Sequence, residues 1–255
     1  MAVTSDRPCS HNHDIHLPIH SSASQYVLST FYVLSTYCGI TSYMSMPSHR
    51  RSGRRLATQQ AISNTATRLF FERGFDRVTV DEIATAADVG RMTVFNHFPR
   101  KEDMFFDRDE EIRKTLREAL RQRDPSVTPI ETLRLLAYRL VADQSPFVEF
   151  SARSQRFIKT IEGSETLKAR ARAIRDEIAQ IVAVALSECL GREPDDPVAR
   201  LASGLLLATW TVALIQAHRT FRKSRDTEKA KAAFLAIVDK GTIGIKAAVA
   251  RTPYA

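Results

Sequence analysis

The strongest constraint on the fold is a stretch of about 20 residues that predicts two short helices separated by a tight turn. Thr79 is followed three residues later by Glu82, the spacing of a capping box, in which each residue bonds a backbone amide of the other. We expect a first helix over about 80–86 and a second over about 90–97. Asp88 falls in the turn, and Asp tolerates a positive φ better than most residues other than glycine. Such a helix-turn-helix places its second helix in the major groove of DNA.

The side chains around this turn fit two helices that cross closely. Ala84 and Ala87 are small enough to let the helices approach each other. Ile83, Val89 and Phe98 are expected to seal the core beneath them. The preceding helix carries an apolar face at helical spacing and meets a suitable C-terminal stop at Gly74.

The charge of the chain agrees with a polyanionic partner. The formal net charge is +8, and residues 50–101 contain ten Arg or Lys and five Asp or Glu. Four arginines form a basic arm immediately before the helix that precedes the helix-turn-helix: Arg50, Arg51, Arg54 and Arg55. An arm of this kind can neutralise phosphates or enter a minor groove.

This segment resembles the DNA-binding domain of the tetracycline-repressor (TetR) family over about 50 residues. The family pattern reads here as Thr79-Val80, Ile83-Ala84-Thr85-Ala86-Ala87, Val89, Thr93, Phe95-Asn96-His97-Phe98 and Lys101-Glu102. Asp88 stands where the family usually has a turn glycine, and Gly90 where it usually has a capping serine. Phe95 replaces the usual phosphate-binding tyrosine and lacks its hydroxyl. The rest of the chain agrees with the family only in helical content and length.

Side-chain chemistry and the resemblance together suggest roles in DNA binding. Arg91 suits guanine, Asn96 suits adenine, and Met92 offers an apolar contact to a thymine methyl. Thr79, Thr93, His97 and Lys101 are candidate phosphate contacts, which set register rather than sequence. The predicted DNA-binding set is Arg54, Arg55, Thr79, Gly90, Arg91, Met92, Thr93, Phe95, Asn96, His97 and Lys101. The alternative for each is an exposed side chain with no role in binding.

The remaining sequence predicts further helices and no convincing strand. One helix is expected over about 100–123, and later starts at the cap-proline pairs Thr128-Pro129, Ser145-Pro146 and Asp196-Pro197. A long helix should end at Gly191, and a last one should span about 227–249. We therefore predict an all-α fold, in which a three-helix helix-turn-helix DNA-binding domain (50–106) precedes a helical ligand-binding and dimerisation bundle (107–250).

The C-terminal half lacks a recognisable catalytic constellation, so we expect neither an enzyme nor a catalytic, cofactor or metal site. The resemblance implies a ligand cavity among the middle helices and a dimer interface formed by the last two. The wide apolar faces of those two helices carry Leu201, Leu205, Val212, Leu235 and Val238, which could pair with a second copy. The candidate ligand-binding residues are Phe147, Phe150, Arg153, Phe157, Trp210 and His218, each of which could equally be ordinary core or a solvated helix face.

We expect a cytoplasmic homodimer that binds double-stranded DNA at a palindromic operator and is released by a small effector. The segment 94–106 is similar to a branch of the family described as binding acyl-CoA-like ligands, which suggests an apolar acid or its thioester. An orphan DNA-binding regulator without a ligand is the main alternative. An enzyme on a helical scaffold and a membrane-tethered regulator are weaker alternatives.

Residues 1–49 differ abruptly from the rest, because they hold only three charged residues (Asp6, Arg7 and Asp14) and carry a short tandem repeat. We expect a disordered or artefactual leader, with the functional protein starting near Met44 or Met46. A membrane span is disfavoured because hydroxyl residues interrupt the apolar run. The three cysteines are too scattered for a disulfide framework or a zinc site, and the leader's Cys and His residues match no usual metal-site spacing.

Overall fold

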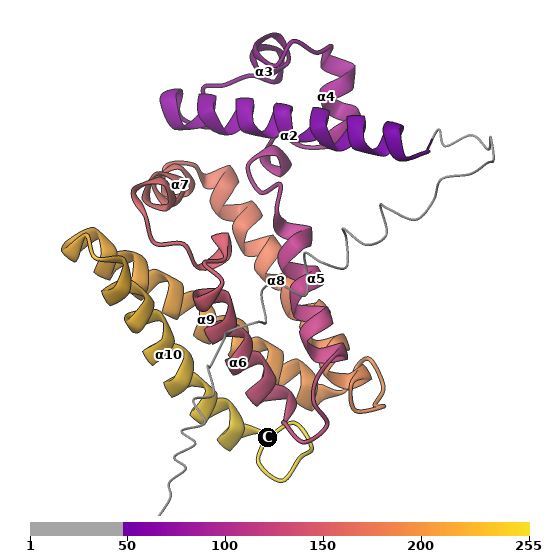
Figure 1. The fold of residues 1–255 in the computed structure, drawn as a ribbon, viewed down its shortest axis with the longest axis vertical. Coiled ribbons are helices and arrows are strands. Elements are labelled where there is room, and N and C mark those ends of the chain that lie inside the picture. The colour runs from indigo at the N-terminus through magenta and orange to yellow at the C-terminus, as the bar shows by residue number, and fades with distance from the viewer. Residues whose placement is uncertain (1–47) are drawn as a thin grey trace, which may run out of the picture. The chain divides into compact units, whose positions relative to one another are not determined.

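Residues 48–255 are described by a computed structural model, with side chains from residue 53 onward, and this part of the chain contains helices and no strand (Figure 1). The expectations for the leader lie outside the described residues. The helices are α2 (Ser48–Arg73), α3 (Val80–Ala86), α4 (Arg91–His97), α5 (Asp109–Arg121), α6 (Pro129–Ala142), α7 (Ala152–Glu162), α8 (Glu165–Glu188), α9 (Pro197–Ser224) and α10 (Thr227–Ala248). Two short 3₁₀ helices are η1 (Lys101–Met104) and η2 (Pro146–Val148). The predicted all-α class is confirmed.

The first hydrophobic core forms where α2, α3 and α4 meet. Ile62 and Phe70 on α2, Ile83 on α3 and Val94 on α4 are all buried in it. α2 ends where expected, because Gly74 adopts a φ of +85°, a conformation that costs glycine no steric strain.

The basic arm is helical rather than extended. Arg54 and Arg55 are exposed on α2, which begins at Ser48, well before its first core residue. An α-helix is about 10–12 Å wide with its side chains, whereas the minor groove of DNA is about 6 Å wide. This geometry favours contact with phosphates over entry of the arm's backbone into a minor groove.

The single helix expected over about 100–123 is wrong, because the chain forms η1 and then starts again as α5. Met104 in η1 and Phe105 directly after it are both buried in the first core. The Ser63 hydroxyl on α2 fixes the break, since it lies 3.2 Å from the Met104 carbonyl oxygen and also bonds the carboxylate of Asp107.

Two of the three predicted cap-proline starts of the C-terminal helices are confirmed, and the third is wrong. Thr128 caps α6 and Asp196 caps α9, each with proline in the first turn. Ser145, by contrast, opens only η2, and α7 begins later behind its own cap, Ser151. α9 and α10 run side by side and pack over their length against a second core shared with α5, α6 and α8 (Figure 1).

The first core is completed by side chains from α7 and α8. The rings of Phe157 on α7 and Phe105 are stacked, with centroids 4.4 Å apart and an interplanar angle of 7°. Leu167 on α8 is fully buried among the same residues, and the Ser164 hydroxyl donates to Asp76 at 2.9 Å. α2, α3 and α4 therefore share their core with helices that lie outside the predicted boundary of 50–106.

Replacement of Leu167 by Ala should lower the free energy of unfolding by about 2–5 kcal/mol, because it leaves a cavity in the first core. Urea unfolding followed by circular dichroism measures this loss. The matched control is Leu56→Ala, since Leu56 is 65% exposed and its truncation should change stability little. Equal effects of the two substitutions would contradict the shared core.

Candidate nucleic-acid interface and effector site

The predicted capping box is present and fixes the start of α3. The Glu82 amide donates to the Thr79 hydroxyl at 3.2 Å, and the Thr79 amide donates to the Glu82 carboxylate at 2.8 Å. Arg73, the last residue of α2, donates to the same carboxylate at 2.7 Å. The Thr79 amide, the Arg73 guanidinium and the Thr79 hydroxyl lower the pKa of Glu82 to about 2. The carboxylate that ties α3 to α2 is thus ionised across the physiological range.

The turn between α3 and α4 has the predicted conformation. Asp88 has a φ of +53°, and the Val89 amide donates to the Ala84 carbonyl at 3.0 Å, which closes the turn. α4 then starts behind Gly90, whose φ of −70° and ψ of 147° are accessible to any residue. Gly90 supplies no side-chain hydrogen bond to the first turn of α4.

The three candidate base readers lie together on the outward face of α4. Met92 is 71% exposed, and Arg91 and Asn96 are exposed as well, while Val94 faces the core. Phe95 lies on this outward face and is partly exposed. A face that carries a guanidinium, an amide and a thioether offers the groups that discriminate base edges in a major groove.

Arg91 is held by two neighbours, one of which the sequence analysis missed. Its Nη1 lies 3.0 Å from Oδ2 of Asp81, at the start of α3, and its guanidinium carbon lies 5.5 Å from the centroid of the Phe95 ring. The ion pair is exposed and adds little stability, but it favours one orientation of the guanidinium. Asp81 and Arg91 are ten residues apart on different helices, so helical spacing does not reveal the pair.

Lys101 has internal partners that its sequence context does not show. Its ammonium donates to the carbonyls of Phe75 and Val78, both at 2.9 Å, and lies 4.0 Å from the centroid of the Phe75 ring. Partial burial lowers its pKa. Two of its three N–H groups thus hold the loop before α3, and the third remains for the predicted phosphate contact.

The other predicted phosphate contacts differ in accessibility. The Thr79 hydroxyl belongs to the capping box, and Thr93 is half-buried. His97 is half-buried, and its Nδ1 is enclosed without a hydrogen-bond partner among the described residues. A contact from His97 to a phosphate would therefore use Nε2.

Three of the six candidate ligand-binding residues form a connected group of rings with Phe234 on α10. The Phe150 and Phe234 ring centroids are 6.1 Å apart, and Trp210 meets Phe234 edge-on at 6.1 Å. His218 meets Phe150 edge-on at 5.1 Å. We call Phe150, Trp210, His218 and Phe234 the aromatic cluster.

The other three candidates lie apart from the aromatic cluster in the contacts they make. Phe157 stacks on Phe105 in the first core, Phe147 lies under the Arg108 guanidinium at 5.6 Å, and Arg153 is exposed at the start of α7. The six residues therefore do not line one site. α7, for example, contacts the first core through Phe157 and the aromatic cluster through Gln155. The sequence alone does not tell which of the two each side chain of such a helix meets.

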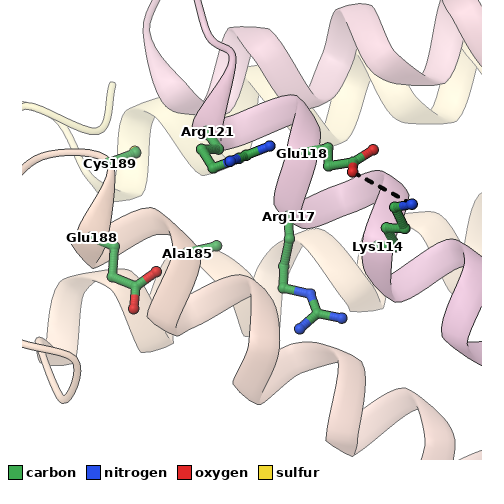
Figure 2. Close-up of a pocket in the computed structure, with 7 residues that line it drawn as sticks. All are labelled: Lys114, Arg117, Glu118, Arg121, Ala185, Glu188 and Cys189. Atoms are coloured by element: carbon green, nitrogen blue, oxygen red, sulfur yellow. Dashed lines mark ion pairs between the residues drawn. The ribbon is translucent and has the colours of Figure 1, made fainter. Parts of the chain in front are cut away.

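A groove of about 480 Å³ lies between α5 and α8, and none of the predicted residues lines it (Figure 2). Its lining residues are Lys114, Arg117, Glu118, Arg121, Ala185, Glu188 and Cys189. Lys114 and Glu118 form an ion pair at 3.8 Å along α5. Among the described residues, no three His, Cys, Asp or Glu side chains come together as a metal site.

Comparison with known proteins finds a family match over the first core. Residues 62–107 match the family described as bacterial regulatory proteins, tetR family. This part of the chain is similar to the TetR family. The match covers α3, α4 and the core-forming part of α2, which together carry the capping box and the outward face of α4.

A similar curated protein is the one named as the mycofactocin biosynthesis transcriptional regulator MftR of Mycobacterium tuberculosis. It is 44% identical over 57 residues, which cover 22% of this chain and 29% of MftR. The likeness to this relative is thus limited to less than a third of its length.

Solved structures of a TetR-family regulator and of a repressor align with about three quarters of the chain. A regulator from Mesorhizobium loti is 19% identical with a TM-score of 0.49, covering 75% of this chain and 98% of its own. NalD of Pseudomonas aeruginosa, a repressor of a multidrug efflux pump, is 23% identical with a TM-score of 0.46, covering 74% and 97% respectively.

Replacement of Gly90 by Ser should stabilise the protein by about 0.5–1 kcal/mol. A serine hydroxyl can cap α4, and serine loses less backbone entropy on folding than glycine. The new Cβ would meet only Thr93 Oγ1, at an ordinary 3.8 Å. Urea unfolding measures the gain, with Gly90→Ala as the control that adds a Cβ without a cap. Destabilisation by serine would contradict the described N-terminus of α4.

Proposed function

We propose that this protein is a DNA-binding transcriptional regulator that inserts α4 into the major groove. The observation that carries this proposal is the outward face of α4, where Arg91, Met92 and Asn96 are exposed together on a helix that follows a closed turn and the capped helix α3. The match of residues 62–107 to the TetR family supports it. The proposed contacts to phosphates are Arg54, Arg55, Thr79, Thr93, His97 and Lys101. Gly90 brings the start of α4 to the groove, and Phe95 brings the Arg91 guanidinium there.

Asn96→Ala should lower affinity for a selected operator by about 1–3 kcal/mol and relax the base preference at one position. Arg54→Ala combined with Arg55→Ala should weaken binding to all sequences and lower the slope of log K against log salt by about two. Fluorescence anisotropy on operator and on scrambled DNA at several salt concentrations measures both effects. Wild-type behaviour of Asn96→Ala on both DNAs would refute α4 as the reading helix.

A homodimer is proposed because one short recognition helix offers too few base contacts for a selective site. Leu201, Val212 and Ile215 on α9 and Ile243 on α10 are exposed apolar residues suited to pairing with a second copy. The sequence also suggested Leu205, Leu235 and Val238 for this face. Leu205 and Leu235 are half-buried, and Val238 lies in the second core, where it cannot pair with a partner.

The exposed apolar residues of α9 (Leu201, Val212 and Ile215) also bear on whether this helix could lie in a membrane. Within the described residues, α9 is the one helix long and apolar enough to cross a membrane, by length and composition alone. One face of α9 packs on α8 and α10, and the other carries the apolar stripe proposed for dimerisation. We therefore propose a protein without a membrane partner.

Ile243→Asp should convert the dimer to a monomer, because Ile243 is 72% exposed in the protomer and an aspartate there would be desolvated only in the dimer. The protomer should keep its helicity, and operator affinity should fall. Analytical ultracentrifugation and circular dichroism measure these outcomes. Leu135→Asp, at an exposed apolar residue on α6, is the matched control and should leave the dimer intact. A monomeric wild-type protein on DNA would refute the homodimer.

We further propose that the regulator is a repressor released by a small, mainly apolar or acyl-type effector bound at the aromatic cluster. Such an effector lowers DNA affinity only if it binds the non-DNA-binding arrangement more tightly than the DNA-binding one. α7 can couple the two states, because Gln155 contacts His218 in the cluster while Phe157 lies in the first core. Release of operator on addition of effector tests this role, and its absence with every ligand that binds would favour an orphan regulator.

A further inference from the structure

The guanidinium of Arg91 is held from two sides. α3 and α4 pack against each other (Figure 1), and Oδ2 of Asp81 on α3 lies 3.0 Å from Nη1 of Arg91 on α4. Phe95 follows Arg91 by four residues and therefore lies on the same face of α4. Its ring centroid is 5.5 Å from the guanidinium carbon, within the range of a cation–π contact. The carboxylate and the ring together restrict where this guanidinium points.

The ion pair leaves Arg91 able to read a base. A guanidinium has five N–H groups, and the bond to Asp81 is the one hydrogen bond that this guanidinium makes among the described residues. A bidentate contact to O6 and N7 of guanine needs two of the N–H groups that remain. Both side chains of the pair are more than half exposed, so neither is enclosed by the protein.

A freely moving arginine discriminates poorly between sequences, because it reaches phosphates as easily as base edges. Contacts to phosphates strengthen binding to every sequence and carry no information about the bases. For Arg91, a move to a phosphate would break a hydrogen bond between two charged groups, which is stronger than one between neutral groups. On DNA without guanine at the right position, a held Arg91 therefore gains little from the backbone in compensation.

We propose that Asp81 is a positioning residue for base reading, which holds Arg91 against the ring of Phe95 in the orientation that contacts guanine. This inference rests on the proposed function and assigns a determinant of its sequence specificity. Asp81 acts through Arg91 and not through a contact of its own with a base. The arrangement raises discrimination at one base pair and lowers affinity for random DNA.

Asp81→Ala tests this role, because it releases Arg91 and leaves the Thr79–Glu82 capping box intact. The probe is a DNA site selected from a random pool by the wild-type protein, and the base that Arg91 reads is the position at which Arg91→Ala loses its preference. Asp81→Ala should reduce the preference at that position about two- to tenfold, since Arg91 must then be ordered on binding. Fluorescence anisotropy on the selected site and its single-base variants measures this change.

Scrambled DNA should show the opposite effect. Asp81→Ala should bind it at least as tightly as the wild type, and the slope of log K against log salt should steepen by about one, because the freed Arg91 neutralises a phosphate. Loss of a merely structural contact would weaken binding to both DNAs alike. That result, an unchanged base preference, or a selected site at which Arg91→Ala loses no preference would overturn the proposal.

Asp88→Asn is the matched control. It removes the same charge from the neighbouring turn, and asparagine tolerates the φ of +53° that Asp88 adopts. The base preference and the salt slope should stay at their wild-type values. Asp81→Ala should also leave the base preference unchanged in an Arg91→Ala background, because the two residues act as one unit. A change that persists without Arg91 would mean that Asp81 reads a base itself, which would overturn its role as a positioning residue.

Two substitutions of Phe95 test the ring. Phe95→Leu removes the cation–π partner and should reduce the base preference, whereas Phe95→Tyr keeps the ring and should keep the preference. Circular dichroism checks that both variants retain the helical fold. Wild-type preference in Phe95→Leu would overturn the second hold on Arg91.

Failure of this inference can be told from failure of the proposed function, because the hold on Arg91 is measurable without DNA. NMR relaxation of the Arg91 Nε–Hε group should give a higher order parameter in the wild type than in Asp81→Ala. Selected DNA that Asp81→Ala reads with unchanged preference would overturn the inference and keep the regulator. An Arg91 that is ordered by Asp81 in a protein that selects no DNA site would refute the regulator, and base reading by the pair with it.

Discussion

The stack of Phe105 on Phe157 is the contact on which the arrangement of the described helices depends. α2, α3 and α4 are too short a segment to bury a large core of their own, and small cores are only marginally stable. Phe157 and Leu167 complete that core from outside the helix-turn-helix. α4 therefore owes part of its rigidity to side chains of α7 and α8.

Ion pairs centred on Arg170 help to orient η1 and the start of α5 relative to α8. Arg170 on α8 is 10% exposed and contacts Asp103 in η1, Asp109 at the start of α5 and Glu177 on its own helix. Arg113 joins the same group through Asp109 and Glu177. Buried ion pairs contribute less to stability than to geometry, because desolvation offsets much of their attraction. Their arrangement here defines how the connection after α4 meets α8.

The sequence predicted the local structure well where a short signal decides it. The Thr79–Glu82 capping box, the positive φ of Asp88 and the Asp196 cap each depend on a few neighbouring residues, and each is present. It failed where a distant partner decides, as at the break after η1, which the Ser63 hydroxyl stabilises from 41 residues away. Phe157 was expected at a ligand site for the same reason, since periodicity shows that a side chain is buried but not which core receives it.

The packing of α9 against α10 has a consequence for which sequences this fold tolerates. A Cβ added at Gly241 would lie 2.1 Å from Thr209 Cγ2, whereas one added at Gly244, a turn later, would meet nothing within 4 Å. Among homologues that keep a threonine at the position of Thr209, Gly241 should be retained, whereas Gly244 can be replaced by other residues. A larger residue at position 241 becomes acceptable only alongside a smaller one at 209, so the two positions form a coupled pair in the evolutionary history of this helix contact.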